Sequence, residues 1–289
     1  MSPATWLITG ASSGFGKFLA LQALQAGFKV IGTTRDVAKA QSQAPDFGAK
    51  GGIWLGLDPG SEDAFEKFSR VSEEHGGIDV LVNNAGYAFI GGVEDTSEEE
   101  VRDQMEVNFY GPLRTVKACL PAMRAKKSGN IILISSGAGF IARPGRSTYS
   151  ASKFAIEAVH ESLSQEVKPL GIKVLIVEPG AFRTPFSARI KSPAQHEATG
   201  GYSEAYRDTP VGGMLNSMRA IVAMDELPPV IKGDPEKAAA AIISAVVDGH
   251  DYLRLPLGTD CVAALEDKIG QLQSDLDKTR AVCMAMDVE

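Results

Sequence analysis

The chain has 289 residues, of which 44% are hydrophobic and 22% are charged, a balance typical of a globular protein with a sizeable core. Its formal net charge of −7 disfavours nucleic-acid and anionic-membrane partners, which bind basic faces. The 3 cysteines form no CxxC pair and the 4 histidines lack metal-ligand spacing, so neither disulfides nor a metal site is expected. Without a basic leader or an apolar run of about 20 residues, the sequence predicts a cytoplasmic protein with no membrane span.

Short apolar segments alternate with helix-like segments along the chain. The pattern predicts strands at residues 6–9, 29–33, 53–57, 80–83, 131–135, 173–178 and 252–255. Helices are expected at 15–26, 61–75, 97–127, 150–169 and 235–248. Most strands are apolar on both faces, as in a parallel sheet covered on each side by helices. We therefore predict one α/β domain over residues 1–289, with a Rossmann-type doubly wound sheet of about seven strands.

Two later segments depart from this alternation. Residues 185–235 are rich in glycine and proline and follow a strand end, where such sheets bind ligands, which favours a substrate lid over a plain linker. Residues 259–286 form a last helix with a narrow apolar stripe of heptad spacing, beginning at Val262 and Leu265. We expect this helix to pack on its own domain, and a subunit contact in a homo-oligomer is the alternative.

A glycine-rich turn, TGASSGFG, lies between the first strand and the first helix. Glycines there let the backbone approach a pyrophosphate at the helix N-terminus, although a plain strand–helix connection is the alternative. The predicted phosphate-binding residues are Gly10, Ser12, Ser13, Gly14, Phe15 and Gly16.

The end of the second strand indicates which nicotinamide cofactor is bound. NAD-preferring folds place a carboxylate there, but this chain has Thr34 followed by Arg35, which suits a 2′-phosphate. We therefore predict NADP(H) over NAD(H), against the alternative of a surface pair between Arg35 and Asp36. Asp58, after the third strand, is a candidate for the adenine amino group or for a turn. Asn84, Ala85 and Gly86, after the fourth strand, are candidates for the cofactor crevice.

Three residues carry the predicted chemistry. Tyr149 and Lys153 are four positions apart at the start of a helix and so share one face, and Ser136 follows the fifth strand. A phenol with a pKa of about 10 is a poor base at neutral pH unless a neighbouring positive charge favours the phenolate. Ser136 could stabilise charge on a substrate oxygen.

The ordered motifs resemble those of the short-chain dehydrogenase/reductase family. They are TGASSGFG, NNAG, Asn108, Ser136, YSASK at 149–153 and PGAFRT at 179–184, and together they cover about residues 4–185. The resemblance implies that Tyr149 is the general acid/base and Ser136 the partner of the substrate oxygen. It implies that Lys153 holds the nicotinamide ribose beside Tyr149 and that Asn108 anchors a proton relay. It also implies that Pro179, Gly180 and Thr184 flank the nicotinamide.

The substrate is predicted to be a mid-sized, rather hydrophobic ketone or secondary alcohol. The residues expected to contact it, besides Ser136 and Tyr149, are Phe140, Phe186, Met214 and Met218. Two other functions remain open: an NADP(H) enzyme with a redox-neutral step, such as epimerisation or cyclisation, and a nucleotide-sensing regulator without chemistry. The complete Ser–Tyr–Lys set disfavours the regulator.

Overall fold

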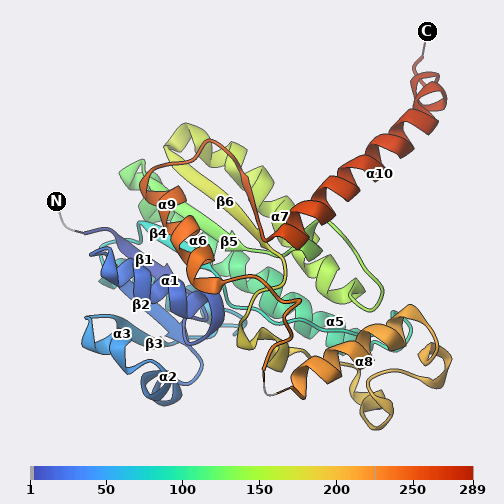
Figure 1. Cartoon of the computed structure of the whole chain (residues 1–289). Helices are drawn as coiled ribbons and strands as arrows, with labels where there is room; N and C mark the ends of the chain where they lie inside the picture. Colours follow the sequence, from blue (N-terminus) through green and yellow to red (C-terminus); the bar gives the residue numbers. More distant parts are fainter. Residues whose placement is uncertain (1–2, 225, 289) are drawn as a thin grey trace.

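The computed structural model describes residues 3–224 and 226–288. Its parallel sheet has the strand order β3-β2-β1-β4-β5-β6-β7 (Figure 1). The strands are β1 (Thr5–Ile8), β2 (Lys29–Thr34), β3 (Ile53–Gly56), β4 (Val80–Asn83), β5 (Gly129–Ile134), β6 (Ile172–Pro179) and β7 (Arg254–Leu257). Chain order reverses between β1 and β4, so this doubly wound sheet has its switch point there, where such folds bind ligands. The predicted fold class is confirmed.

Alternate residues of each strand pack against different helix layers. Trp6 and Ile8 of β1 share a core with α1 (Gly14–Gln25) and α9 (Pro235–Val247). Leu7, between them, faces the opposite core, which is built with α4 (Ala64–Glu74), α6 (Gly111–Lys126) and α7 (Ser147–Val167). This period of two, with both faces covered, explains why the strands read as continuous apolar runs.

The predicted helix over 97–127 divides into three parts. It begins at α5 (Glu98–Met105), passes through a π-helical turn, η1 (Glu106–Tyr110), and continues as α6. Ser97 and Glu100 form a capping box at its start, so each satisfies an otherwise unpaired backbone N–H. Two short helices, α2 (Val37–Gln43) and α3 (Pro45–Ala49), escaped the prediction because they are too short for a helical period to be recognised.

The segment 185–235 also contains more helix than its composition predicts. It consists of the 3₁₀ turns η4 (Pro185–Arg189), η5 (Ala194–Thr199) and η6 (Glu204–Tyr206), followed by α8 (Pro210–Val222). Thr209 caps α8 by accepting a hydrogen bond from the Val211 N–H, and Pro210 occupies its first turn.

The last helix, α10 (Thr259–Met284), leaves the domain and projects away from it (Figure 1). Of its residues only Cys261 is buried, and Ile269, Leu272 and Leu276 are about half exposed. The expectation that this helix packs on its own domain is therefore wrong, since only its beginning, up to about Leu265, is partly covered by the rest of the domain. No helix of the described chain is both long and apolar enough to cross a bilayer.

Candidate active site

The glycine-rich turn joins β1 to α1 at the switch point of the sheet. Gly10 and Gly14 have φ values of +63° and +55°, which side-chain-bearing residues rarely adopt. A Cβ at Gly16 would lie 2.5 Å from both the Asn84 Nδ2 atom and the Gly10 carbonyl oxygen, so only glycine fits there. Asn84 holds the turn by donating to the carbonyls of Thr9 (2.9 Å) and Gly10 (3.1 Å). Thus Asn84 and the glycines form one preorganised cradle.

Two arginines flank this cradle. Arg189, from the 185–235 segment, donates to the Ser13 hydroxyl. Burial, and then the charge of the nearby Arg35, lower the pKa of Arg189. The carboxylate of Asp36 accepts from the Lys39 N–H at 2.9 Å and caps α2, which removes the alternative of an Arg35–Asp36 pair. Neither arginine forms an ion pair within the described chain. Two neighbouring guanidinium groups without a counter-charge suit a polyanion. Arg189 could not be predicted, because 176 positions separate it from Ser13.

Asp58 shapes its own turn. Its Oδ1 atom accepts a hydrogen bond from the Gly60 N–H at 2.9 Å, and its carbonyl accepts one from the Ser61 hydroxyl at 2.8 Å. This geometry corresponds to the turn alternative raised from the sequence.

Ser136, Tyr149 and Lys153 converge at the carboxyl end of β5. Burial raises the pKa of Tyr149, while a hydrogen bond with Ser136 and the charge of Arg146 oppose this rise. Lys153 is buried, donates to the Ile134 carbonyl at 2.9 Å, and has its Nζ atom 6.0 Å from the centre of the Tyr149 ring. Burial also lowers the pKa of Lys153 to about 8. Arg146 is therefore a second cation near the phenol, besides Lys153, and the sequence prediction did not include it.

Asn108 lies in the π-helical turn between α5 and α6. Its Nδ2 atom donates to the Tyr87 carbonyl (3.0 Å) and the Ser152 hydroxyl (3.1 Å), and its Oδ1 atom accepts from the Tyr87 N–H (3.2 Å). A Cβ at Gly86 would be 3.1 Å from Asn108 Oδ1 and 3.9 Å from Lys153 Nζ. The side chains of Asn108 and Lys153 thus both approach Gly86, and the relay stays a prediction.

A cavity of about 490 Å³ connects the glycine cradle with Tyr149. Its wall includes Pro179, Gly180 and Thr184 from the end of β6, and Phe186 and Met218 from the 185–235 segment. Phe140 and Met214, predicted as substrate contacts, are not part of the wall. Met214 packs instead into an apolar cluster with Ile90 and Tyr202, and Phe140 turns toward Gly137.

A tight turn before α7 brings two more arginines to this cavity. The Arg146 N–H donates to the Arg143 carbonyl at 3.0 Å across Pro144 and Gly145, and Gly145 has φ +74°. Proline followed by a positive-φ glycine is the pattern of a type II turn, whose two ends lie close together. Arg143 and Arg146 both line the cavity.

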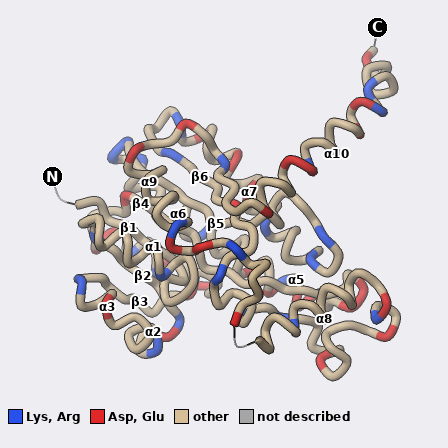
Figure 2. Tube along the Cα trace, in the orientation of Figure 1, with Lys and Arg blue, Asp and Glu red and all other residues tan. Residues whose placement is uncertain are grey.

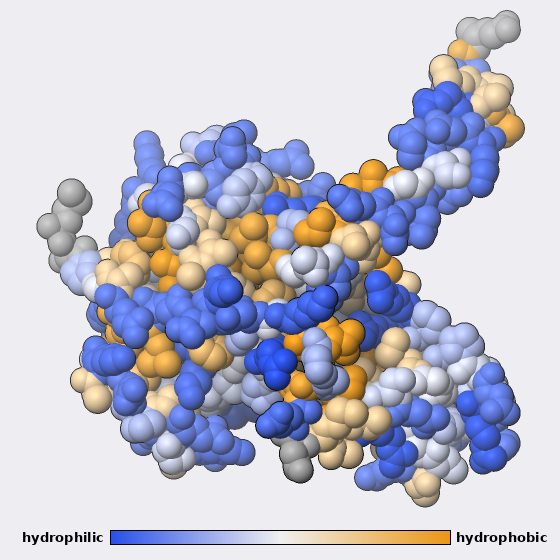
Figure 3. Space-filling view, in the orientation of Figure 1, coloured by the Kyte–Doolittle hydropathy of each residue, from blue (hydrophilic) through white to orange (hydrophobic). Residues whose placement is uncertain are grey.

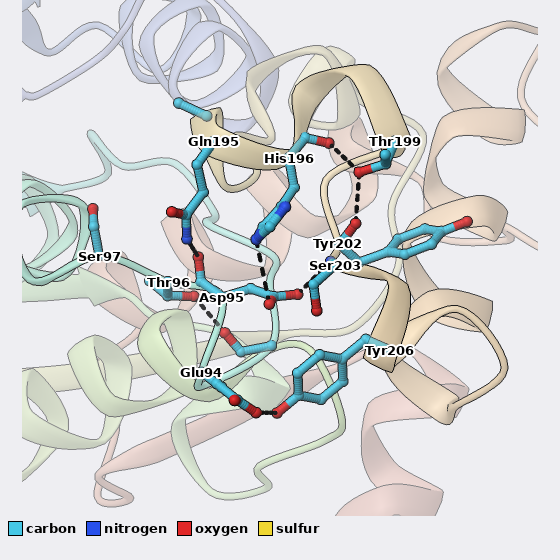
Figure 4. Close-up of polar contacts among 12 residues, drawn as sticks. Glu94, Asp95, Thr96, Ser97, Gln195, His196, Thr199, Tyr202, Ser203 and Tyr206 are labelled. Carbon is cyan, nitrogen blue, oxygen red and sulfur yellow. Dashed lines mark hydrogen bonds and ion pairs between the residues drawn. The ribbon is translucent and has the colours of Figure 1, made fainter.

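The 185–235 segment is fastened to the loop before α5 (Figure 4). The buried carboxylate of Asp95 accepts from the Ser203 N–H at 2.8 Å and lies 3.4 Å from the His196 Nε2 atom. Gln195 donates to the Asp95 carbonyl at 2.7 Å, and the Tyr206 hydroxyl reaches Glu94 at 3.5 Å. We call these contacts the Asp95 latch.

A buried carboxylate pair lies one helical turn beyond Lys153. Glu157 accepts from the Ser135 hydroxyl, and Arg254 bridges Glu157 (3.0 Å) and Glu178 (3.3 Å). Both carboxylates are almost fully buried. Arg254 also pairs with Glu161 at 2.6 Å, so one guanidinium serves three carboxylates. Burial and the Glu157 charge raise the pKa of Glu178 to about 8.

Comparisons with known proteins agree with this geometry. Residues 4–195 match the family model described as short chain dehydrogenase. Over 263 residues the chain is 41% identical to a 3-ketodihydrosphingosine reductase of Bacteroides thetaiotaomicron, with 89% of each chain covered. A solved short-chain dehydrogenase from Streptomyces avermitilis is 37% identical, with a TM-score of 0.82 and 99% of both chains covered. A solved metagenomic short-chain oxidoreductase in complex with NADP is 25% identical, with a TM-score of 0.65, covering 89% of this chain and 96% of that one.

The fold and the Ser–Tyr–Lys site define an oxidoreductase with a doubly wound dinucleotide-type sheet. The chain belongs to the short-chain dehydrogenase family. Within the described residues, no group of three or more His, Cys, Asp or Glu side chains is placed to hold a metal ion.

Proposed function

We propose that the protein interconverts a ketone and a secondary alcohol with NADP(H). The observation that carries the proposal is the convergence of Ser136, Tyr149 and Lys153 on a cavity that continues into the glycine cradle. When bound, the nicotinamide supplies or accepts the hydride. Tyr149 donates a proton to the carbonyl oxygen during reduction, while Ser136 orients that oxygen. In this proposal Lys153 and Asn108, whose side chains both lie near Gly86, relay protons to the phenol.

The preference for NADP(H) over NAD(H) rests on two arginines. Arg35 follows β2 at the ribose position, and Arg189 lies near it on the other side of the cradle. Paired guanidinium groups favour a dianionic 2′-phosphate over a neutral hydroxyl. The NADP in the solved metagenomic oxidoreductase is consistent with this assignment.

We also propose that residues 185–235 form the substrate lid. Phe186, Ile190 and Met218 line the cavity, and the Tyr149 and Phe186 rings have their centres 6.4 Å apart. An apolar wall directly over the phenol favours a mid-sized, largely hydrophobic substrate body.

The proposal is tested by mixing the protein with NADPH and a panel of aryl, steroid and aliphatic ketones, and following the loss of NADPH absorbance. Turnover of at least one ketone, lost in Tyr149→Phe, is the expected result. Tight NADPH binding without turnover of any carbonyl would contradict the proposal, and would favour the redox-neutral enzyme or the regulator.

A further inference from the structure

The cavity is basic although the chain as a whole is acidic. The charged residues that line it are Arg143, Arg146, Lys153, Arg189 and Asp260. The single carboxylate, Asp260, accepts a hydrogen bond from the Ala181 N–H at 2.8 Å and stabilises the loop after β6. Lys153 and Arg189 have assigned partners in the proposed cofactor site, so Arg143 and Arg146 remain without a partner.

Arg146 is the better placed of these two arginines. Its Nε atom is shielded from solvent and has no hydrogen-bond partner, and its side chain forms no ion pair within residues 3–224 and 226–288. The side chain as a whole is partly exposed, but shielding even one N–H of a guanidinium from water without a partner is unfavourable. The side chain is nevertheless kept beside Tyr149, at the end of the turn that also carries Arg143. This arrangement is expected where a ligand supplies the missing anion.

We propose that Arg146, assisted by Arg143, binds a carboxylate on the substrate, which is therefore an oxo acid with a largely apolar body. Arg146 precedes Tyr149 by three residues at the start of α7 and lines the same cavity, so one substrate can present its carboxylate to Arg146 and its carbonyl to Tyr149. The planar guanidinium matches a carboxylate through two parallel hydrogen bonds. The inference rests on the proposed carbonyl reduction and adds the functional group that selects the substrate.

The test compares an oxo acid with its methyl ester as substrates. Both substrates react through Tyr149, so a change in the strength of this general acid alters both rates equally. The ratio of kcat/KM for the acid to that for the ester therefore reports on the carboxylate alone. A charged hydrogen bond contributes about 1.5–3 kcal/mol, so the acid should exceed the ester in kcat/KM by about 10- to 100-fold. In Arg146→Met the ratio should fall to near one, and Arg146→Lys should restore part of it. Ser187→Ala, elsewhere on the cavity wall, should leave the ratio unchanged.

A binding measurement separates this inference from the proposed function. The protein is loaded with NADP⁺ and titrated with the hydroxy acid and its ester by calorimetry, which requires no turnover. Tighter binding of the acid than of the ester, lost in Arg146→Met, supports the carboxylate site even if no rate is measurable. Equal binding of acid and ester, or a ratio unchanged in Arg146→Met, would overturn it. Failure of turnover alone would contradict only the proposed reduction.

A second, independent observation concerns the projecting helix α10. Its apolar stripe consists of Val262, Leu265, Ile269, Leu272 and Leu276, followed at the same 3-4 spacing by Thr279 and Cys283. Val262, Ile269, Leu272 and Leu276 are 41–58% exposed, and Figure 3 shows apolar residues on this helix among hydrophilic ones. A repeat of 3.5 residues is the signature of helices that pack on one another as a coiled coil.

The charges on α10 favour another protein chain over a lipid surface. The helix has five acidic and three basic residues, interspersed along its length (Figure 2), whereas helices that lie on anionic membranes have basic polar faces. With the stripe at heptad positions a and d, Asp275 is at g and Arg280 at the following e position. Residues at positions g and e pair between the two helices of a parallel coiled-coil dimer.

We propose that α10 pairs in parallel with the α10 of a second copy of this chain. In register, each Asp275 faces Arg280 of the partner helix, and the two Cys283 residues meet at an a position. Cys283 is exposed, while Cys119 and Cys261 are buried, so mild oxidation reports on this one contact.

The dimer is tested by sedimentation and by oxidative cross-linking. We expect a dimer at micromolar concentration, a disulfide-linked dimer on a non-reducing gel, and loss of both in Leu272→Asp. The matched control, Ser274→Asp on the outer face, should stay dimeric, and Cys283→Ser should remove only the cross-link. A monomeric protein, a dimer that survives Leu272→Asp, or binding to neutral lipid vesicles without self-association would overturn the proposal.

Discussion

At the scale of single residues, the hydroxyl of Tyr149 is the group on which the proposed chemistry depends. Tyr149→Phe removes the proton donor and retains the ring that faces Phe186. General acid–base catalysis contributes about 10²- to 10⁴-fold, so kcat should fall by about that factor. The dissociation constant for NADPH, measured by fluorescence titration, should change less than about threefold, because the phenol is only one of many groups along the cofactor site. A variant that retains most of its kcat would exclude Tyr149 as the acid.

Arg35 and Arg189, the arginines proposed to bind the 2′-phosphate, can be tested by comparing the binding of NADPH and NADH. Arg35→Ala and Arg189→Ala should each weaken NADPH binding by about 10- to 100-fold, since each removes charged hydrogen bonds to a phosphate. NADH binding should weaken much less in Arg35→Ala, and the NADPH loss should shrink at high salt as the charges are screened. Lys39→Ala, on the exposed side of α2, serves as the control. Equal losses for NADPH and NADH in Arg35→Ala would remove the ground for naming NADP(H).

At the scale of elements, the Asp95 latch determines how the 185–235 segment is held. Asp95→Ala removes acceptors for the Ser203 N–H and the His196 ring, which leaves a buried N–H without a partner. We expect faster proteolysis within 185–235 and a higher KM, because the wall of the cavity that contains Phe186 and Met218 becomes less fixed. Ser203→Ala retains the N–H and should behave like the wild type. An unchanged proteolysis pattern in Asp95→Ala would show that other contacts hold the segment.

The elements also show what local sequence can and cannot predict. Strand positions and the glycine turn were predictable because they depend on neighbouring residues: a period of two, and a backbone that only glycine adopts. The π-helical turn that carries Asn108 and the helix α8 are not visible in such patterns. Arg146 and Arg189 escaped prediction because nothing local distinguishes them from surface arginines, and their environment comes from segments distant in the chain. The same holds for Met214, which the tertiary packing turns into a cluster with Tyr202 and away from the cavity.

At the scale of the whole molecule, the buried Glu157–Glu178 pair links stability to pH. The pKa of Glu178 rises from 4.5 to about 8 on folding, mainly by burial and by the Glu157 charge. Because its pKa is higher in the folded state, the protonated form of this carboxyl group favours folding. Its contribution to stability is therefore complete below the unfolded-state pKa. This contribution is lost as the pH rises from about 4.5 through about 8, because the unfolded chain then releases a proton that the folded chain retains. The protein should therefore become less stable across that window, apart from the effects of its other groups.

Glu178→Gln removes the extra proton of this pair, because glutamine has nearly the same shape and does not titrate, and the difference between the two proteins reports on the Glu157–Glu178 pair. Urea unfolding of both proteins at several pH values between 5 and 9 should show the wild type losing stability relative to the variant as the pH rises. The buried Lys153, whose pKa is lowered to about 8, changes the stability only above that pH. Lys153 and the buried His160 are present in both proteins, so their effects cancel when the two curves are compared. Parallel curves for the two proteins would mean that Glu178 is ionised in the fold at neutral pH. Arg254 would then lie between two ionised carboxylates, and β7 would be held at the sheet edge by ion pairs rather than by a contact to a protonated Glu178.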